Sequence, residues 1–212
     1  MTKIVNLHQY SRRRTSPPNS TDDNCGCYPP VLCTKRLILR PFSPADAPDV
    51  RRLAGDRDIA ANTSLIPHPY EEGMAEAWIN SHRESFERGK ALHYAIVLSQ
   101  RDCLCGAIGL RIDIANIHAE LGYWIGKPFW GRGYCTEAAQ TLIRYGFTVL
   151  KLNRIYATHF VKNPASGRVM QKVGMAHEGC LRQHIWKWGK FEDVEQYGLL
   201  NSEWQARRFG RE

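Results

Sequence analysis

A glycine-containing stretch at residues 130–135, Trp-Gly-Arg-Gly-Tyr-Cys, has the residue types and the setting of a phosphate-binding loop. It follows an apolar run at 121–125 and precedes a helical pattern that continues to Leu150. The two glycines, Gly131 and Gly133, allow a tight turn and a close approach of the backbone to a ligand. The first amides of a helix have no partner within the helix, and with the helix dipole they favour an anion. An ordinary strand-to-helix turn accounts for the same residues, so the loop alone does not decide.

Glu120 lies in the apolar run just before this loop. Strand side chains alternate between two faces, which predicts that His118 and Glu120 share one face. A carboxylate in this position is a candidate general base. The alternative is a structural carboxylate that forms an ion pair with an arginine. The sequence leaves both interpretations open.

A second helix start is predicted at Asn163-Pro-Ala-Ser166. Asn163 is a typical N-cap residue, Pro164 suits the first helical position, and Gly174 suits the left-handed position that ends a helix. Ser166 then falls in the first turn, with its hydroxyl near the start of the helix. Capping alone would also explain both polar residues.

The elements that position these groups predict a mixed α+β domain. Apolar and charged residues alternate in 34–40, as in a strand with one exposed face. Three strands follow a pair of helices, and the helix opened by the glycine loop is followed by a strand, a helix and a hairpin. The expected strands are 34–40, 91–98, 104–114, 117–125, 154–158, 175–186 and 191–201. The expected helices are 43–54, 71–88, 163–174 and the one that the glycine loop opens, which continues to 150.

Composition indicates one domain with a short extension at each end. The chain has 212 residues, 43% of them apolar, and no apolar run approaches the roughly 20 residues of a membrane span. Residues 1–33 are polar and proline-rich, which predicts a disordered basic arm, and 204–212 are expected to form a short basic tail. These two segments carry half of the formal net charge of +8. A nucleic acid is therefore not expected as the primary ligand.

The seven cysteines are an odd number, which favours reduced thiols and a cytoplasmic location over a disulfide framework. Two close pairs, Cys25 with Cys27 and Cys103 with Cys105, lack the two-residue spacer of common zinc sites. No histidine lies at matching spacing. We therefore expect no metal site.

Four segments in order give a more specific interpretation. They are Arg36-Leu-Ile-Leu-Arg40, Trp130-Gly-Arg-Gly-Tyr-Cys-Thr-Glu-Ala138, Asn163-Pro-Ala-Ser-Gly-Arg-Val-Met170 and Glu178-Gly-Cys-Leu-Arg182. With the order of elements, they resemble the GNAT acetyltransferase superfamily, in particular its RimJ/RimL-type branch, over residues 34–203. The resemblance implies a central, mostly antiparallel twisted sheet of about seven strands flanked by helices, with a splayed parallel pair at the acetyl-CoA site.

The resemblance also implies roles for particular residues. The backbone of Trp130, Gly131, Arg132, Gly133, Tyr134 and Cys135 would hold the pyrophosphate of acetyl-CoA. The strand Tyr123, Trp124, Ile125 would pair with the pantetheine arm and polarise the thioester carbonyl. Asn163 would contact the pantetheine, and Ser166 would act as general acid near the sulfur. An acceptor α-amine, with a pKa of roughly 7.7–8.0, would need only a modest base such as Glu120 acting through water.

Two positions depart from the family pattern. Pro128 stands where glutamine or arginine usually begins the phosphate loop. Met170 stands where many members have a tyrosine that protonates the thiolate, and a methionine has no proton to donate.

The activity implied is direct transfer of acetyl from acetyl-CoA to an amine in a ternary complex. The acceptor would be a protein N-terminal amine or a small amine, selected by segments 55–70 and 183–191. A non-catalytic acyl-CoA-binding module is the alternative, and Met170 is the one feature in its favour. Relatives commonly dimerise, so a homodimer is a further expectation, whereas a membrane partner is not.

Overall fold

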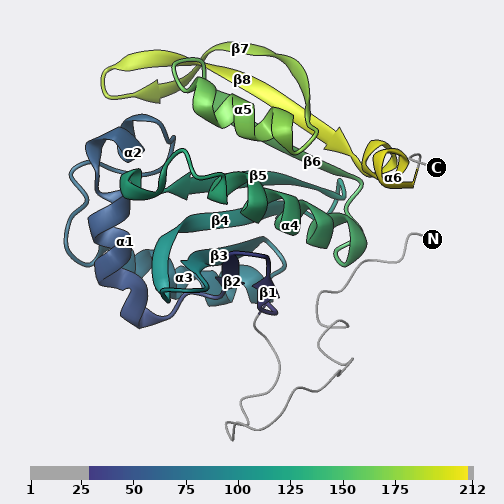
Figure 1. Ribbon diagram of the computed structural model, residues 1–212. Helices are drawn as coiled ribbons and strands as arrows, with labels where there is room; N and C mark the ends of the chain where they lie inside the picture. The colour runs from purple at the N-terminus through teal and green to yellow at the C-terminus, as the bar shows by residue number, and fades with distance from the viewer. Residues whose placement is uncertain (1–28, 210–212) are drawn as a thin grey trace, which may run out of the picture.

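A single sheet of eight strands with helices on both faces makes up the computed structural model, which describes residues 29–209 (Figure 1). The strand order is β1-β2-β3-β4-β5-β6-β8-β7, and every neighbouring pair is antiparallel except β5 and β6. The mostly antiparallel sheet with one parallel pair, implied by the sequence motifs, is confirmed.

The bounds of the elements follow the chain. The strands are β1 (Leu32–Cys33), β2 (Leu37–Arg40), β3 (Ala91–Leu98), β4 (Cys103–Asp113), β5 (His118–Ile125), β6 (Arg154–Phe160), β7 (Ala176–Lys187) and β8 (Lys190–Leu200). The α-helices are α1 (Ala47–Ala54), α2 (Arg57–Ala61), α3 (Met74–Glu87), α4 (Tyr134–Thr148), α5 (Pro164–Lys172) and α6 (Asn201–Phe209).

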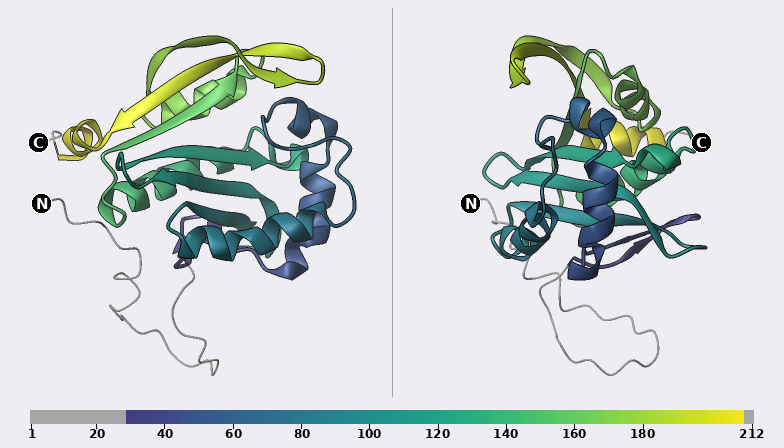
Figure 2. Two further views of the ribbon diagram at one scale, coloured as in Figure 1. Left: turned by 180° about the vertical axis from the view of Figure 1, so that it is seen from behind. Right: turned by 90° about the vertical axis from the view of Figure 1, so that its left-hand side faces the viewer.

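Two apolar cores lie on the two faces of the sheet. On one face, α4 contributes Leu142 and Ile143 to a cluster with Leu110 and Leu121. On the other face, α1 and α3 pack against β3 and β4 in a second cluster. The views in Figure 2 show α3 and α1 on the side of the sheet opposite to α4. Because β3 is covered on both faces, its sequence Ala-Leu-His-Tyr-Ala-Ile-Val-Leu is almost continuously apolar.

Most of the predicted elements are present, and β3 has the predicted bounds. Three differences concern the ends and one loop. Leu32 and Cys33, which composition places in the arm, form β1 and pair with β2. The expected tail is largely the helix α6, because Trp204 packs against Phe147 with ring centroids 5.5 Å apart. The segment 55–70 contains the short helix α2.

The rest of the expected arm, residues 1–28 with Cys25 and Cys27, lies outside the described residues. Within residues 29–209, no helix is long and apolar enough to cross a membrane. The five cysteines in this part of the chain are free thiols, and no three His, Cys, Asp or Glu side chains within it are grouped as metal ligands would be.

Candidate active site

The parallel strands β5 and β6 pair over only part of their length. Pairing runs from His118 with Arg154 to Glu120 with Tyr156. Beyond that point β5 continues to Ile125 and β6 to Phe160, each still paired with its other neighbour. The edge of β5 that faces β6 is therefore available to a ligand over its last five residues, next to the start of α4.

The backbone groups that face this opening follow from the register with β4. Gly126 donates its N–H to the carbonyl oxygen of Cys105 at 2.8 Å, opposite it on β4. Because hydrogen-bonded and non-hydrogen-bonded pairs alternate along an antiparallel ladder, Trp124 also points its backbone to β4. Tyr123 and Ile125 point theirs to the opening. The Ile125 carbonyl already accepts a hydrogen bond from the Trp130 indole Nε1 at 2.6 Å.

The glycine loop has the geometry that the sequence predicted. Gly131 and Gly133 have φ values of +73° and +77°, and Gly133 is the N-cap of α4 without a side-chain cap. The first helical bond is donated by Glu137 to the Gly133 carbonyl. Within the described part of the chain, the amides of residues 131–136 therefore have no hydrogen-bond acceptor. A Cβ added to Gly131 would meet nothing within 4 Å, and one added to Gly133 would meet only Arg36 Nη2 at 3.5 Å, so the loop is open beside both glycines.

Two residues of the predicted phosphate loop 130–135, Trp130 and Cys135, have other contacts. The Trp130 amide donates to the Lys127 carbonyl at 3.2 Å, so it is already used in the turn that precedes the loop. The Cys135 thiol packs against the core below α4, and burial raises its pKa, so it is held as a neutral thiol. Both residues belong to the loop as predicted, but only the amides after Trp130 are left without an acceptor among the described residues.

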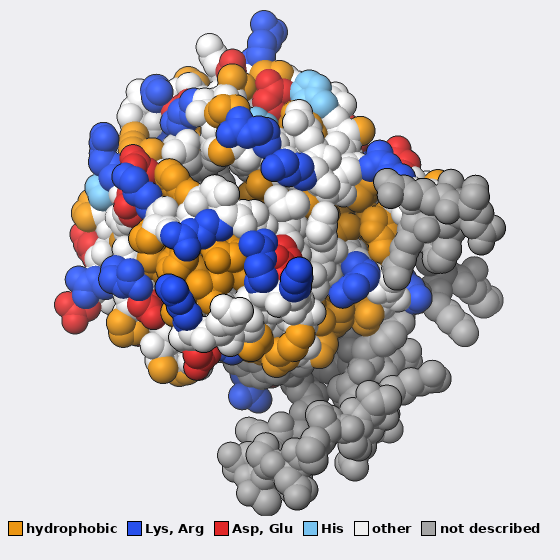
Figure 3. All heavy atoms as spheres, in the orientation of Figure 1, with side chains coloured by type: hydrophobic (Ala, Val, Ile, Leu, Met, Phe, Trp, Pro, Cys, Tyr) orange, Lys and Arg blue, Asp and Glu red, His pale blue; other side chains and the backbone are white. Residues whose placement is uncertain are grey.

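Cationic side chains border the start of α4. Arg36 donates from Nη1 to the Arg132 carbonyl at 2.9 Å and from Nε to Glu137 at 2.7 Å. A hollow of about 450 Å³ adjoins the loop. It is lined by Lys35, Arg36, Gly133, Thr136, Glu137, Gln140 and Lys172. In Figure 3, Lys and Arg side chains are scattered over this face of the molecule with carboxylates between them.

Glu137 has a structural role at this point, as its place in the first turn predicted. It accepts hydrogen bonds from the Thr34 hydroxyl at 2.6 Å and from the Arg36 amide at 2.9 Å. Burial alone would raise the pKa of Glu137, but these bonds and the Arg36 charge outweigh it and lower the pKa. The carboxylate thus ties the start of β2 to the start of α4.

Ser166 lies in the first turn of α5, where its backbone N–H donates to the Asn163 side-chain oxygen at 3.3 Å. Its hydroxyl lies 2.9 Å from the Tyr123 hydroxyl, which is also 3.1 Å from the Ser166 carbonyl oxygen. Burial raises the pKa of Tyr123 well above its ordinary value, so that this side chain is neutral. The sequence identified Tyr123 only through its backbone, and the contact between the two side chains was missed.

Glu120 lies on the other face of the sheet from this pair. Trp124 packs with the α1 and α3 cluster and Tyr123 with the α4 cluster, so alternation places Glu120 on the α1 and α3 face. The Glu120 carboxylate forms an ion pair with Arg111, and it is 3.5 Å from both the Tyr156 and the Thr158 hydroxyls. The ion pair is the structural alternative that the sequence left open for this residue. The opening between β5 and β6 has Ser166 on one face and Glu120 on the other.

The segment 55–70 is fastened next to the opening by contacts that no sequence pattern indicated. Asp58 on α2 forms an ion pair with Lys127, just before the glycine loop. The Asn163 side-chain amide donates to the Asn62 carbonyl at 3.5 Å. The buried Lys187 ammonium donates to the carbonyl oxygens of Ile66 at 2.8 Å and Ser64 at 3.4 Å.

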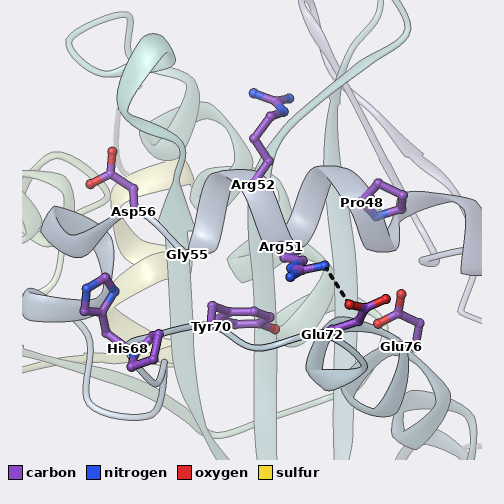
Figure 4. A pocket seen from close by; sticks show the side chains of 10 residues that line it. Pro48, Arg51, Arg52, Gly55, Asp56, His68, Tyr70, Glu72 and Glu76 are labelled. Carbon is purple, nitrogen blue, oxygen red and sulfur yellow. Dashed lines mark ion pairs between the residues drawn. The ribbon is translucent and has the colours of Figure 1, made fainter.

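A hollow of about 870 Å³ lies between α1 and this segment (Figure 4). Its lining carries both signs of charge, and Arg51 forms an ion pair with Glu72 at 3.8 Å. The lining residues are Pro48, Arg51, Arg52, Gly55, Asp56, His68, Pro69, Tyr70, Glu72 and Glu76.

Comparison with known proteins identifies the chain's relatives. The acetyltransferase (GNAT) domain family matches residues 36–176. The chain is 32% identical to the uncharacterized N-acetyltransferase p20 of Bacillus licheniformis, over 82% of this chain and 98% of the relative. It is 34% identical to the ribosomal-protein-serine acetyltransferase of Escherichia coli (strain K12), over 54% of this chain and 63% of the relative.

A solved structure, spermidine N-acetyltransferase from Vibrio cholerae in complex with CoA and spermine, shares the fold. The TM-score is 0.70 at 22% identity, covering 81% of this chain and 99% of that one.

Proposed function

Because this chain belongs to the acetyltransferase (GNAT) domain family, we propose that it transfers the acetyl group of acetyl-CoA directly to a primary amine. Amine and thioester would be bound together in a ternary complex. The predicted membership of the RimJ/RimL-like branch is confirmed by the ribosomal-protein acetyltransferase among the relatives.

The observation that carries this proposal is the row of amides without acceptors at 131–136, next to the unpaired edge of β5. These amides, the positive end of α4 and the nearby Arg36 suit a pyrophosphate. The backbone groups of Tyr123 and Ile125 suit an extended pantetheine arm, which would add a short strand to the edge of β5. Asn163, at the far side of the opening, would contact the same arm.

The chemistry follows from the two faces of the opening. Backbone N–H groups of β5 would polarise the thioester carbonyl and stabilise the oxyanion that forms when the amine attacks. Ser166 would donate a proton to the departing sulfur. Glu120 would accept the amine proton through water from the opposite face, with Arg111 holding the carboxylate in place.

For the acceptor we propose an N-terminal α-amine of a protein, with a small amine as the second candidate. An α-amine, with a pKa of roughly 7.7–8.0, is far easier to deprotonate than a lysine amine. A carboxylate acting through water is therefore a sufficient base. The segments 55–70 and 183–191 would form the acceptor side and select among amines. Reduced thiols at all five described cysteines support a cytoplasmic setting for this reaction.

The test is thermal unfolding with acetyl-CoA, 3′,5′-ADP or S-acetylpantetheine, followed by an assay of released thiol with short peptides and polyamines. Acetyl-CoA at 100 times its dissociation constant should add about 2.7 kcal/mol to the free energy of unfolding. Each fragment should give a smaller shift, because it meets only the amide row or only the β5 edge. No shift with acetyl-CoA would contradict the site. A shift without thiol release from any amine would favour the non-catalytic alternative.

A further inference from the structure

The Tyr123 and Ser166 side chains form a contact across the opening between β5 and β6. Tyr123 lies on β5 beyond the last residue that pairs with β6, and Ser166 lies on the helix that follows β6. The Tyr123 hydroxyl is 2.9 Å from the Ser166 hydroxyl and 3.1 Å from the Ser166 carbonyl oxygen. The tyrosine O–H thus has two acceptors on one residue, and it can turn from one to the other without moving the ring.

A serine hydroxyl that donates a proton needs its hydrogen directed to the sulfur. A hydroxyl rotor is free to point elsewhere unless a neighbour fixes it. Met170 on α5 stands where many family members have a tyrosine, but it is 1% exposed and has no proton to donate, so it cannot fix the serine hydroxyl. Asn163 contacts the backbone amide of Ser166 but not its hydroxyl. Within the described part of the chain, Tyr123 is the side chain that contacts the Ser166 hydroxyl.

We propose that Tyr123 is a positioning residue for Ser166, a role that rests on the proposed function. Before reaction the tyrosine O–H is donated to the Ser166 carbonyl. When the serine hydroxyl turns its hydrogen to the sulfur, the tyrosine O–H turns to the serine oxygen and stabilises the negative charge that develops there.

The step balances without a further reactant. The amine nitrogen forms a bond to the acetyl carbon, and the carbon–sulfur bond breaks. The sulfur takes the proton of the Ser166 hydroxyl. The amine nitrogen loses a proton to solvent, and solvent returns a proton to Ser166. Tyr123 keeps its own proton throughout, because its buried ring makes a tyrosinate costly. In the net reaction a C–S and an N–H bond are lost, and a C–N and an S–H bond are gained.

The test is a double-mutant cycle of Tyr123→Phe and Ser166→Ala with steady-state kinetics for acetyl-CoA and an active amine. Tyr123→Phe keeps the ring, so kcat should fall about tenfold while KM for acetyl-CoA stays within about twofold. Ser166→Ala should lower kcat at least as much. The double variant should be no slower than Ser166→Ala, because Tyr123 acts through the serine.

Tyr94→Phe is the matched control. Tyr94 is fully buried, and its hydroxyl has no hydrogen-bond partner within the described residues, so its loss should leave kcat unchanged. If Tyr123→Phe had the kcat of the wild type, the role of Tyr123 would be overturned, and the proposed function would still stand. Independent, multiplicative losses in the double variant would overturn that role too, as would a melting temperature lowered by more than about 5 °C, which would indicate a packing role. Absence of acetyl transfer by the wild type itself would overturn the proposed function, and this inference with it.

Discussion

The two sides of the candidate active site are built in different ways. On the cofactor side, the opening of β5, the glycine loop and the start of α5 are shaped by backbone geometry. On the side where we propose that the acceptor binds, which we call the acceptor side, the segment 55–70 and the β7–β8 hairpin are joined by a few side chains. Lys187 donates to the carbonyls of Ser64 and Ile66, and Trp188 lies 5.9 Å from the His68 ring.

The two sides should therefore tolerate different substitutions. A row of amides and an unpaired strand edge are made by the main chain, so they tolerate many side chains provided that the glycines remain. A segment fastened by individual side chains shifts when one of them is replaced. We therefore expect cofactor binding to depend on the loop glycines, and acceptor choice to depend on the contacts that fasten 55–70.

The largest expected effect comes from closing the amide row. Gly131→Glu places a carboxylate where the pyrophosphate would lie, so acetyl-CoA should bind about 100-fold more weakly, a loss of about 2.7 kcal/mol. The measurement is isothermal titration. Gly189→Glu is the matched control, because Gly189 has φ +81° and an added Cβ would meet nothing within 4 Å, as at Gly131, but it lies in the hairpin. Equal losses in the two variants would show that backbone strain, not the anion site, is responsible.

The next effect concerns α3, which packs with α1 on the face of the sheet opposite to α4. His82 and His93 stack with ring centroids 4.3 Å apart, beside Phe42 and Trp78. Burial lowers the pKa of His82 to about 3, with a smaller contribution from His93, and burial lowers that of His93 to about 4. Both side chains are thus neutral in the folded protein at neutral pH.

As the pH falls below the ordinary histidine pKa of about 6.5, the unfolded chain binds protons that the folded chain excludes. Stability should therefore be lost between about pH 6.5 and pH 3, by roughly 2 kcal/mol per histidine at pH 5. His82→Phe should reduce the loss at pH 5 by about that amount in urea unfolding, and the exposed His184→Phe should not. Hydrogen exchange at pH 5 should show that the amides of α3 exchange faster than those of α4. The reverse order would mean that the loss of stability does not come from His82 and His93.

The smallest effect separates the two sides directly. Lys187→Met removes the ammonium that holds the carbonyls of Ser64 and Ile66, so KM for the amine should rise about tenfold. KM for acetyl-CoA should stay within about twofold, because the amide row is untouched. Lys190→Met, on the same hairpin with a side chain 65% exposed, is the control. An equal rise in both Michaelis constants for Lys187→Met would mean that the two sides are not separable.

The cofactor side was also the part that the sequence predicted best. Glycines at positive φ, a proline after an N-cap asparagine and an alternating strand pattern each determine the backbone conformation of only the few residues around them. The positions of Gly131, Gly133 and Asn163 could therefore be predicted without knowing what packs around them. The hydrogen bond from the Trp130 amide to the Lys127 carbonyl is also local, but it belongs to a short 3-10 helix, Lys127–Phe129, that the sequence pattern did not predict.

Other features required the tertiary structure. The backbone of Trp124 faces β4 while that of Tyr123 faces the opening, and only the register with β4 decides which residue does which. Glu120 lies across the sheet from Ser166, because the two residues belong to opposite faces. The helix α6 was missed because Trp204 packs on Phe147, a residue of α4 far away in the chain.

The sequence by itself determined the order of elements, the glycine turn that opens α4, the α5 cap and the family. The tertiary structure decided which side chains meet: Tyr123 with Ser166, Glu120 with Arg111, and Lys187 with the carbonyls of 64 and 66. Turns and caps are stabilised by hydrogen bonds between near neighbours, so their residue types reveal them. Contacts between distant residues depend on strand register and on the packing of whole helices, which no short stretch of sequence specifies.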